Sequence, residues 1–375
     1  MTSLTRRTLS LGLLAMGSTA ITGCTPRPSL VHAQIAPQPN TRSVLVATNR
    51  TATPDPTLQF VDGRSDDLSF LRYDISVPPN RTLGSYAFPQ KNIDPDREFF
   101  VSNTQHYAIP PHFVTSVNTE LRKAPDDSGN LLLFVHGFNV SHSGAVFRAA
   151  QIATDFGLDA PMMLFSWPSA ARVSRYAYDR DSVLFARKAL ADTLATLAQS
   201  QTRKITILAH SMGGFLAMEA LKRLSLEGDA KTLTRVEGVI LAQPDIDVDV
   251  FRSQMTDIDL QKHFVVVLAS GRDRALKLST VLTGGHPRVG TGGDIEDLRH
   301  RGVFVVDVSD VGSRDFLRHD TYASSPALLK MIRSGRLSER IIAGAPGQDL
   351  LIEGVRLTGE AALAIAHLPY AVSGL

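Results

Sequence analysis

The residues best suited to do chemistry in this chain lie around Ser211. The stretch Lys204–Ala209 is rich in Ile, Leu and Thr, which favours a buried strand, and the pattern of Phe215–Leu226 favours a helix. Between them stands Ala209-His210-Ser211-Met212-Gly213. A sharp strand-to-helix turn with small neighbours, called a nucleophile elbow, exposes a serine hydroxyl at the edge of a sheet. The usual pattern is G-x-S-x-G, so Ala209 is a mild departure, and we predict that Ser211 is a nucleophile.

A serine hydroxyl is a weak nucleophile, so it needs a base, and the base needs an acid to orient it. In proteins with this elbow, the acid and then the histidine follow the serine along the chain, each on a loop after a later strand. Asp273 comes three residues after the predicted strand His263–Ser270, and we favour it as the acid. Asp245 and Asp247 follow the preceding predicted strand and remain alternatives.

Four histidines follow the candidate acid. His300 directly precedes the predicted strand Val303–Val308, which puts it at the wrong edge of the sheet, and His367 lies in a tail that we do not place. His319 follows that last strand by a loop of suitable length, so we favour it as the base. His286, on the preceding loop, is the alternative.

An oxyanion needs two backbone donors near the serine. The N–H of Met212 at the start of the predicted helix is one. The predicted strand Leu131–Val135 runs into His136 and Gly137, and the glycine lets this backbone approach a substrate. We therefore predict the Phe138 N–H as the second donor.

Five segments together resemble the α/β-hydrolase superfamily, and in particular a bacterial esterase/lipase-like branch of undetermined function. They are Val46–Arg50, Val135–Asn139, Phe165–Ser169, Tyr178–Arg180 and Ala209–Gly213. The resemblance runs from about residue 42 to 325. It implies a Ser-Asp-His hydrolase and names no substrate.

Two further features lie near the predicted site. Trp167, the only tryptophan, follows a predicted strand at the catalytic edge, and it either lines a substrate pocket or caps the core. We interpret Tyr178-Asp179-Arg180 as a loop anchor, within a predicted loop at 171–182 that could overhang the site.

The order of apolar strands and helices from residue 131 predicts a mostly parallel sheet covered on both faces, the α/β class. Ser43–Thr48 and Leu71–Val77 predict additional N-terminal β segments, and residues 50–70 between them read as a loop. We assign residues 41–344 to one hydrolase domain.

Three further segments complete the domain organisation. Val114–Arg122 fits either a strand or a short helix, and residues 345–375 have a structure that we do not place. Residues 25–40, rich in proline, predict an extended tether.

Residues 1–24 describe an export signal, with Arg6 and Arg7 before an apolar run that ends at Cys24. The Ile-Thr-Gly-Cys ending resembles a bacterial lipobox, so we expect Cys24 to be lipidated and to anchor the exported protein in the cell envelope. Cleavage after Ala33, as in an ordinary secretory signal, is the alternative.

Composition limits the classes of partner. The chain is 43% hydrophobic and 20% charged with a net charge of +2, which falls to zero without the two signal arginines, so nothing indicates nucleic-acid binding. We find no metal-binding H-E-x-x-H pattern and no phosphate-binding glycine loop, and we expect no cofactor.

The sequence therefore predicts an exported, lipid-anchored serine hydrolase that acts on a small or lipid-like carboxylic ester. An amidase, peptidase or thioesterase with the same triad is an alternative. A non-catalytic, envelope-anchored binding protein on the same fold is another.

Overall fold

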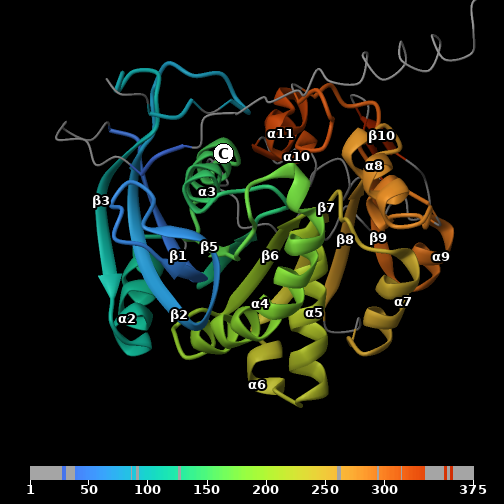
Figure 1. Cartoon of the computed structure of the whole chain (residues 1–375), viewed down its shortest axis with the longest axis horizontal. Helices are drawn as coiled ribbons and strands as arrows, with labels where there is room; N and C mark the ends of the chain where they lie inside the picture. Colours follow the sequence, from blue (N-terminus) through green and yellow to red (C-terminus); the bar gives the residue numbers. More distant parts are fainter. Residues whose placement is uncertain are drawn as a thin grey trace, which may run out of the picture.

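The computed structural model describes residues 28–30, 39–85, 87–89, 93–125, 128–259, 263–293, 295–313, 315–333, 350–352 and 355–357. Within them the chain forms one β-sheet covered by helices (Figure 1). The predicted export signal with Cys24 and the histidine at position 367 lie outside the described residues.

The described strands form an eleven-stranded sheet in the order β10-β11-β9-β8-β7-β6-β4-β5-β1-β2-β3. From β9 across to β1 each strand is parallel to its neighbours, while β2 and β3 at one end and β11 and β10 at the other are antiparallel. The strands are β1 (Thr41–Ala52), β2 (Phe60–Ser76), β3 (Phe100–Tyr107), β4 (Asn130–Val135), β5 (Met162–Ser166), β6 (Lys204–His210), β7 (Val236–Ala242), β8 (Phe264–Ala269), β9 (Val303–Asp307), β10 (Leu350–Ile352) and β11 (Val355–Leu357).

Helices connect the strands. They are α2 (Pro110–Leu121), α3 (His142–Asp155), α4 (Tyr176–Leu197), α5 (Met212–Leu226), α6 (Ala230–Leu233), α7 (Val248–Thr256), α8 (Arg274–Leu282), α9 (Ile295–His300), α10 (Thr321–Ser324) and α11 (Pro326–Arg333), with short 3₁₀ turns η1 (Val173–Arg175) and η2 (Val289–Thr291). Figure 1 shows α4 and α5 lying side by side over the sheet.

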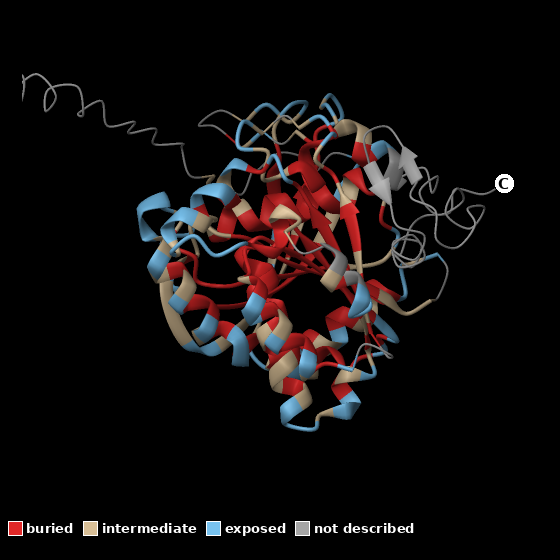
Figure 2. Cartoon of the chain, turned by 90° about the vertical axis from the view of Figure 1, so that its right-hand side faces the viewer, coloured by how far each residue is buried: buried red, intermediate tan, exposed pale blue. Residues whose placement is uncertain are grey.

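The sheet has a hydrophobic core on each face. In β1, Val44 and Val46 belong to one core, while Leu45 and Ala47 belong to the other, because successive side chains of a strand point to opposite faces. Side chains of α3, α10 and α11 complete the first core, and those of α2, α4, α5 and α7 complete the second. Figure 2 shows the buried residues gathered in the sheet and on the inner faces of the helices. The predicted α/β architecture is confirmed.

Two local predictions differ from the structure, and one open alternative is decided by it. Residues 50–70 are not all loop, because β2 begins at Phe60 and pairs there with the end of β1. The ambiguous segment around 114–122 is helix α2, and α4 begins at Tyr176, inside the stretch predicted as a loop. In β2, pairing with β1 outweighs the local turn signals.

The predicted tether also needs correction at residues 28–30. The side chain of Leu30 is buried in the first core, and its N–H donates to the Thr57 carbonyl at 2.7 Å. The Pro28 carbonyl accepts from the Ser143 hydroxyl at 2.5 Å. An apolar side chain and two hydrogen bonds hold this part of the segment against the domain.

The described part of the C-terminal segment extends the sheet. Leu357 of β11 pairs with Val306 of β9, and β10 pairs with β11. None of the helices in the described ranges has the length and apolar character needed to cross a bilayer.

Candidate active site

Ser211 lies at the turn between β6 and α5, as the sequence predicts. Its backbone has φ 52° and ψ −123°, a left-handed conformation that is strained for any residue except glycine. The Ser211 N–H donates to the Ala242 carbonyl of the neighbouring strand at 3.0 Å, which holds the strained turn in place. A Cβ atom at Gly213 would lie 2.3 Å from the His136 carbonyl oxygen, so only glycine fits there.

The loop after β4 packs directly against this elbow. A Cβ atom at Gly137 would lie 2.7 Å from His210 Nδ1 and 3.0 Å from Ser211 Cβ. Met212 is the first residue of α5, where an amide has no acceptor within its own helix. Both predicted oxyanion segments therefore meet beside Ser211, and the roles of the Met212 and Phe138 N–H groups stay predictions.

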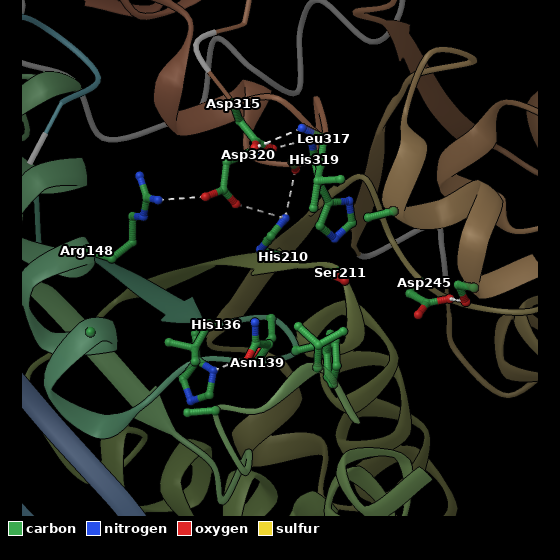
Figure 3. A pocket seen from close by; sticks show the side chains of 18 of the residues that line it. His136, Asn139, Arg148, His210, Ser211, Asp245, Asp315, Leu317, His319 and Asp320 are labelled. Atoms are coloured by element: carbon green, nitrogen blue, oxygen red, sulfur yellow. Dashed lines mark hydrogen bonds and ion pairs between the residues drawn. The ribbon is translucent and has the colours of Figure 1, made fainter. Parts of the chain in front are cut away.

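His319 and Asp273 come together as predicted. The Nδ1–H of His319 donates to Oδ2 of the buried Asp273 at 2.7 Å. Figure 3 shows the His319 imidazole next to Ser211, and both side chains line the same cavity. Asp273 is also the N-cap of α8, because its Oδ1 accepts from the Leu276 N–H at 2.9 Å. The helix thus fixes the carboxylate that orients the histidine.

The alternative acids have other partners. Asp245 accepts from the hydroxyls of Tyr176 and Ser279, at 2.9 Å and 2.6 Å. Asp247 caps α7, and the exposed His286 lies 3.7 Å from it. Asp247, His286 and Asp249 also bring three possible metal ligands within 4.8 Å, but such exposed acidic groups are common without an ion.

The environment of His319 raises the affinity of its imidazole for a proton. Burial lowers its pKa, while the hydrogen bond and charge of Asp273, and the charges of Asp320 and Asp245, act in the opposite direction and raise the pKa above its ordinary value. A raised pKa makes the imidazole a stronger proton acceptor.

Gln243 is a positioning residue that the sequence analysis missed. Its Nε2 donates both to Asp273 Oδ2 and to the Arg318 carbonyl, each at 2.6 Å, and its Oε1 accepts from the Thr321 N–H at 3.2 Å. The side chain thus joins the acid to the loop that carries the base. Its position directly after β7 could have pointed to the catalytic edge.

The loop that carries His319 is held by Asp315, which the sequence analysis also missed. The Asp315 carboxylate accepts from the N–H groups of Leu317, His319 and Asp320, at 3.1, 2.7 and 3.1 Å. Three backbone donors on one side chain fold this loop into a tight turn beside the elbow (Figure 3). The spacing of an aspartate four residues before a loop histidine was the only sequence signal.

A polar chain continues from this loop to α3. Asp320 accepts from Arg148 at 2.7 Å, and its other oxygen lies 3.6 Å from Nε2 of His210 (Figure 3). His210 Nε2 also contacts the His319 carbonyl at 3.0 Å. Burial, followed by the charge on His319, lowers the pKa of His210 to about 4, so His210 is neutral at pH 7. It therefore donates to this carbonyl and does not titrate with the base.

The segments that carry the family resemblance converge behind the loop at residues 136–139, which we call the oxyanion loop after its predicted role. Buried Arg50 donates to the Ser166 hydroxyl and to the carbonyls of Ser169 and Val140, at 3.1, 2.9 and 2.8 Å. Asp179 accepts from the Ser169 hydroxyl at 2.5 Å, and also from the backbone amides of residues 170 and 139. The interpretation of the Tyr178-Asp179-Arg180 segment as an anchor is confirmed.

Trp167 does not line the substrate pocket, which corrects one of the two predicted roles. Its side chain is fully buried in the second core and stacks on His136 with ring centroids 5.0 Å apart. Its Nε1–H donates to the His136 carbonyl at 2.7 Å. The indole thus supports the oxyanion loop from below, because a ring with one polar atom finds its partner there.

A cavity of about 430 Å³ opens above Ser211. The oxyanion loop, the loop of His319, α8, and residues Val173 and Tyr176 form its walls, and Arg148 lies at one end. Its lining is rich in apolar side chains, among them Phe88, Phe134, Phe138, Val140, Leu276 and Tyr322. The space admits a small molecule with an apolar chain.

A family model matches residues 111–336, more than half of the chain, and its description is "Alpha/beta hydrolase of unknown function (DUF900)". None of the curated proteins matches the sequence.

Several solved structures are similar to the chain. A protein named as a candidate cell surface hydrolase from Lactobacillus plantarum is 11% identical with a TM-score of 0.36, and the match covers 54% of this chain and 90% of that one. Aspergillus fumigatus lipase B is 14% identical with a TM-score of 0.27, over 38% and 31% of the two chains. A Trichoderma reesei cutinase solved with a phosphonate inhibitor is 15% identical with a TM-score of 0.26, over 52% and 90%. Likeness at these levels carries no argument about the activity of this chain.

Proposed function

The chain belongs to the alpha/beta hydrolases of unknown function, and on that premise we propose that it is a serine hydrolase that cleaves carboxylic esters. The observation that carries the proposal is the 2.7 Å hydrogen bond from His319 Nδ1 to Asp273, with Ser211 strained at the elbow beside the imidazole. A serine with a purely structural role requires neither a strained backbone nor a histidine held in position beside it.

In the proposed reaction, Ser211 Oγ attacks the carbonyl carbon of the ester while its proton passes to Nε2 of His319. The N–H groups of Met212 and Phe138 donate to the oxyanion that forms. His319 then gives the proton to the leaving alcohol, and the acyl group remains on Ser211. Water attacks the carbonyl carbon of this acyl-enzyme while His319 accepts a proton from it. The bond from the acyl carbon to Ser211 Oγ then breaks, His319 returns the proton to Oγ, and the carboxylic acid leaves.

Hydrolysis of a p-nitrophenyl ester series, from acetate to longer acyl chains, tests the proposal. We expect turnover by the full chain, loss of at least ~10³-fold in Ser211→Ala, and no change in Ser225→Ala, at the other end of α5. A fluorophosphonate should label the protein and fail to label Ser211→Ala.

If the folded protein shows neither turnover nor labelling, the proposal of an enzyme is refuted and a non-catalytic binding protein is favoured. Labelling without ester turnover would mean that Ser211 is activated and that the substrate is an amide or a thioester.

We also propose that the protein is exported and is anchored in the bacterial envelope through Cys24. The lipobox at the end of the apolar run supports this, because several acyl chains bind a membrane firmly. Fractionation of cells that express the chain should place it with membranes, and Cys24→Ala should move it to the soluble fraction. An unchanged distribution would contradict the anchor.

A further inference from the structure

The mouth of the catalytic cavity is surrounded by exposed apolar side chains. Val173, Leu278, Leu282 and Leu317 line the cavity and are also exposed to solvent. Val281 and Phe316 stand beside them in the chain and are 73% and 79% exposed. We call this set of six side chains the apolar rim.

The apolar rim is a marked concentration of such residues. Among the described residues, six of the ten large hydrophobic side chains that are exposed belong to it. Soluble proteins rarely gather exposed apolar side chains around one opening unless that opening meets an apolar partner. The clustering therefore indicates a surface that is covered while the protein works.

Cations outnumber acids among the exposed charges on the segments that carry the rim. Arg172, Arg175, Arg274 and Lys277 are exposed, and the exposed Asp310 is paired with Arg272. The Arg274 guanidinium lies 4.7 Å from the centre of the exposed Phe316 ring. Asp273 and Asp315 of the same segments face inward, because both bind the His319 loop. Apolar side chains with flanking cations suit a bilayer that contains anionic headgroups.

The N-terminal segment reaches the same cavity. Pro28 is part of the cavity wall, and its carbonyl is tied to Ser143. Only three residues lie between Cys24 and Pro28, so the four steps from one Cα atom to the other span at most about 14 Å. Acyl chains on Cys24 would hold the cavity within that distance of the membrane surface.

From the rim, its cations and the short reach of the N-terminus, we propose that the cavity mouth docks on the bilayer that holds the anchor. The ester substrate is then a membrane-resident acyl ester that enters the cavity from that bilayer. This inference rests on the proposed ester hydrolysis and on lipidation of Cys24. It extends the proposed function by naming the class of the substrate and the membrane from which the substrate comes.

Tryptophan fluorescence in vesicles tests the docking. The full chain, processed in a bacterial host, is reconstituted into vesicles of phosphatidylglycerol and brominated phosphatidylcholine, whose bromine atoms quench indole on contact. The two variants are Phe316→Trp, in the rim, and Leu226→Trp, a matched control that is 67% exposed at the far end of α5. After subtraction of the Trp167 signal, we expect at least about twofold quenching for Phe316→Trp and none for Leu226→Trp.

A second measurement follows the substrate. In Val281→Glu/Phe316→Glu, hydrolysis of diacylglycerol placed in the vesicles should fall about tenfold, while hydrolysis of soluble p-nitrophenyl acetate stays at the native rate. Leu226→Glu should alter neither rate.

The proposal is overturned if both introduced tryptophans are quenched alike, if neither is quenched, or if the mass of the processed protein shows no acyl groups. It is overturned equally if the double variant keeps its rate on diacylglycerol. If the proposed ester hydrolysis is wrong, the native chain will not turn over soluble p-nitrophenyl acetate. The fluorescence quenching experiment can still be interpreted in that case, because it needs no activity.

Discussion

Replacing Gly213 with alanine is the sharpest test of the elbow geometry. The added Cβ would lie 2.3 Å from the His136 carbonyl oxygen and 2.6 Å from that of Val135, whereas ordinary contacts begin at 3.4 Å and those under 3.0 Å are essentially never seen. The elbow and the end of β4 must therefore separate by about 0.7 to 1.1 Å. Both oxygens belong to the backbone, so no side-chain rotation relieves the clash.

That separation moves the two predicted oxyanion donors apart. A misplacement of about 1 Å in a catalytic group costs on the order of 10²-fold in rate, and overpacking of this kind costs about 1–3 kcal/mol of stability. We expect kcat of Gly213→Ala on p-nitrophenyl butyrate to fall by about 10²-fold, with a smaller change in KM. The protein should still fold, with a lower Tm.

Steady-state kinetics and thermal unfolding, measured side by side, check this prediction. Gly312→Ala is the matched control, because a Cβ there meets no atom within 4 Å and both values should stay native. A folded Gly213→Ala protein with kcat within about threefold of the native value would refute the reasoning about the oxyanion loop.

Three further substitutions test the surroundings of the triad. Asp320→Asn removes a charge that raises the pKa of His319, and because the base must be neutral, the acid limb of kcat/KM against pH should move to lower pH. Gln243→Leu leaves buried partners of three hydrogen bonds unsatisfied, so it should lower the free energy of unfolding by about 1–3 kcal/mol for each unpaired group and reduce kcat. Trp167→Phe removes a donor to the oxyanion loop and should cost about 1–3 kcal/mol while leaving the acyl-length preference unchanged.

Each of these predictions has its own contrary result. Asp310→Asn, at an exposed ion pair with Arg272, should leave the pH profile alone, and an equal shift in both variants would mean that the effect is not local. Native stability of Gln243→Leu in urea unfolding would show that its hydrogen bonds are replaced by water. If Trp167→Phe changes the acyl-length preference, the indole does contribute to the substrate pocket.

The parts of the candidate site that depend on the order of elements along the chain could be predicted from the sequence. Apolar strands alternating with helices predict a parallel sheet, and a parallel sheet brings the loops after β6, β8 and β9 to one edge. Ser211, Asp273 and His319 could therefore be chosen by position alone. Of His319 and His286, only His319 follows β9, and the structure places it in contact with Asp273.

Residues that act through distant partners could not be read in this way. Gln243 and Arg148 look like ordinary polar residues in the sequence. Their roles depend on a backbone carbonyl 75 positions away and a carboxylate 172 positions away. Trp167 fits a pocket or a core equally well until the position of the His136 carbonyl is known. β3 carries alternating polar residues with no strong strand signal, and its pairing with β2 decides its structure.

The bond between Arg148 and Asp320 closes a long loop beside the site, since its ends lie 172 residues apart. Such a contact forms only after the sheet between its ends has assembled, because closing a long loop is entropically costly before other contacts hold it. The loop that carries His319 is therefore among the last parts of the chain to reach its place during folding. Recovery of activity after dilution from denaturant would consequently lag behind the recovery of secondary structure, and the catalytic rate would report the final step of folding.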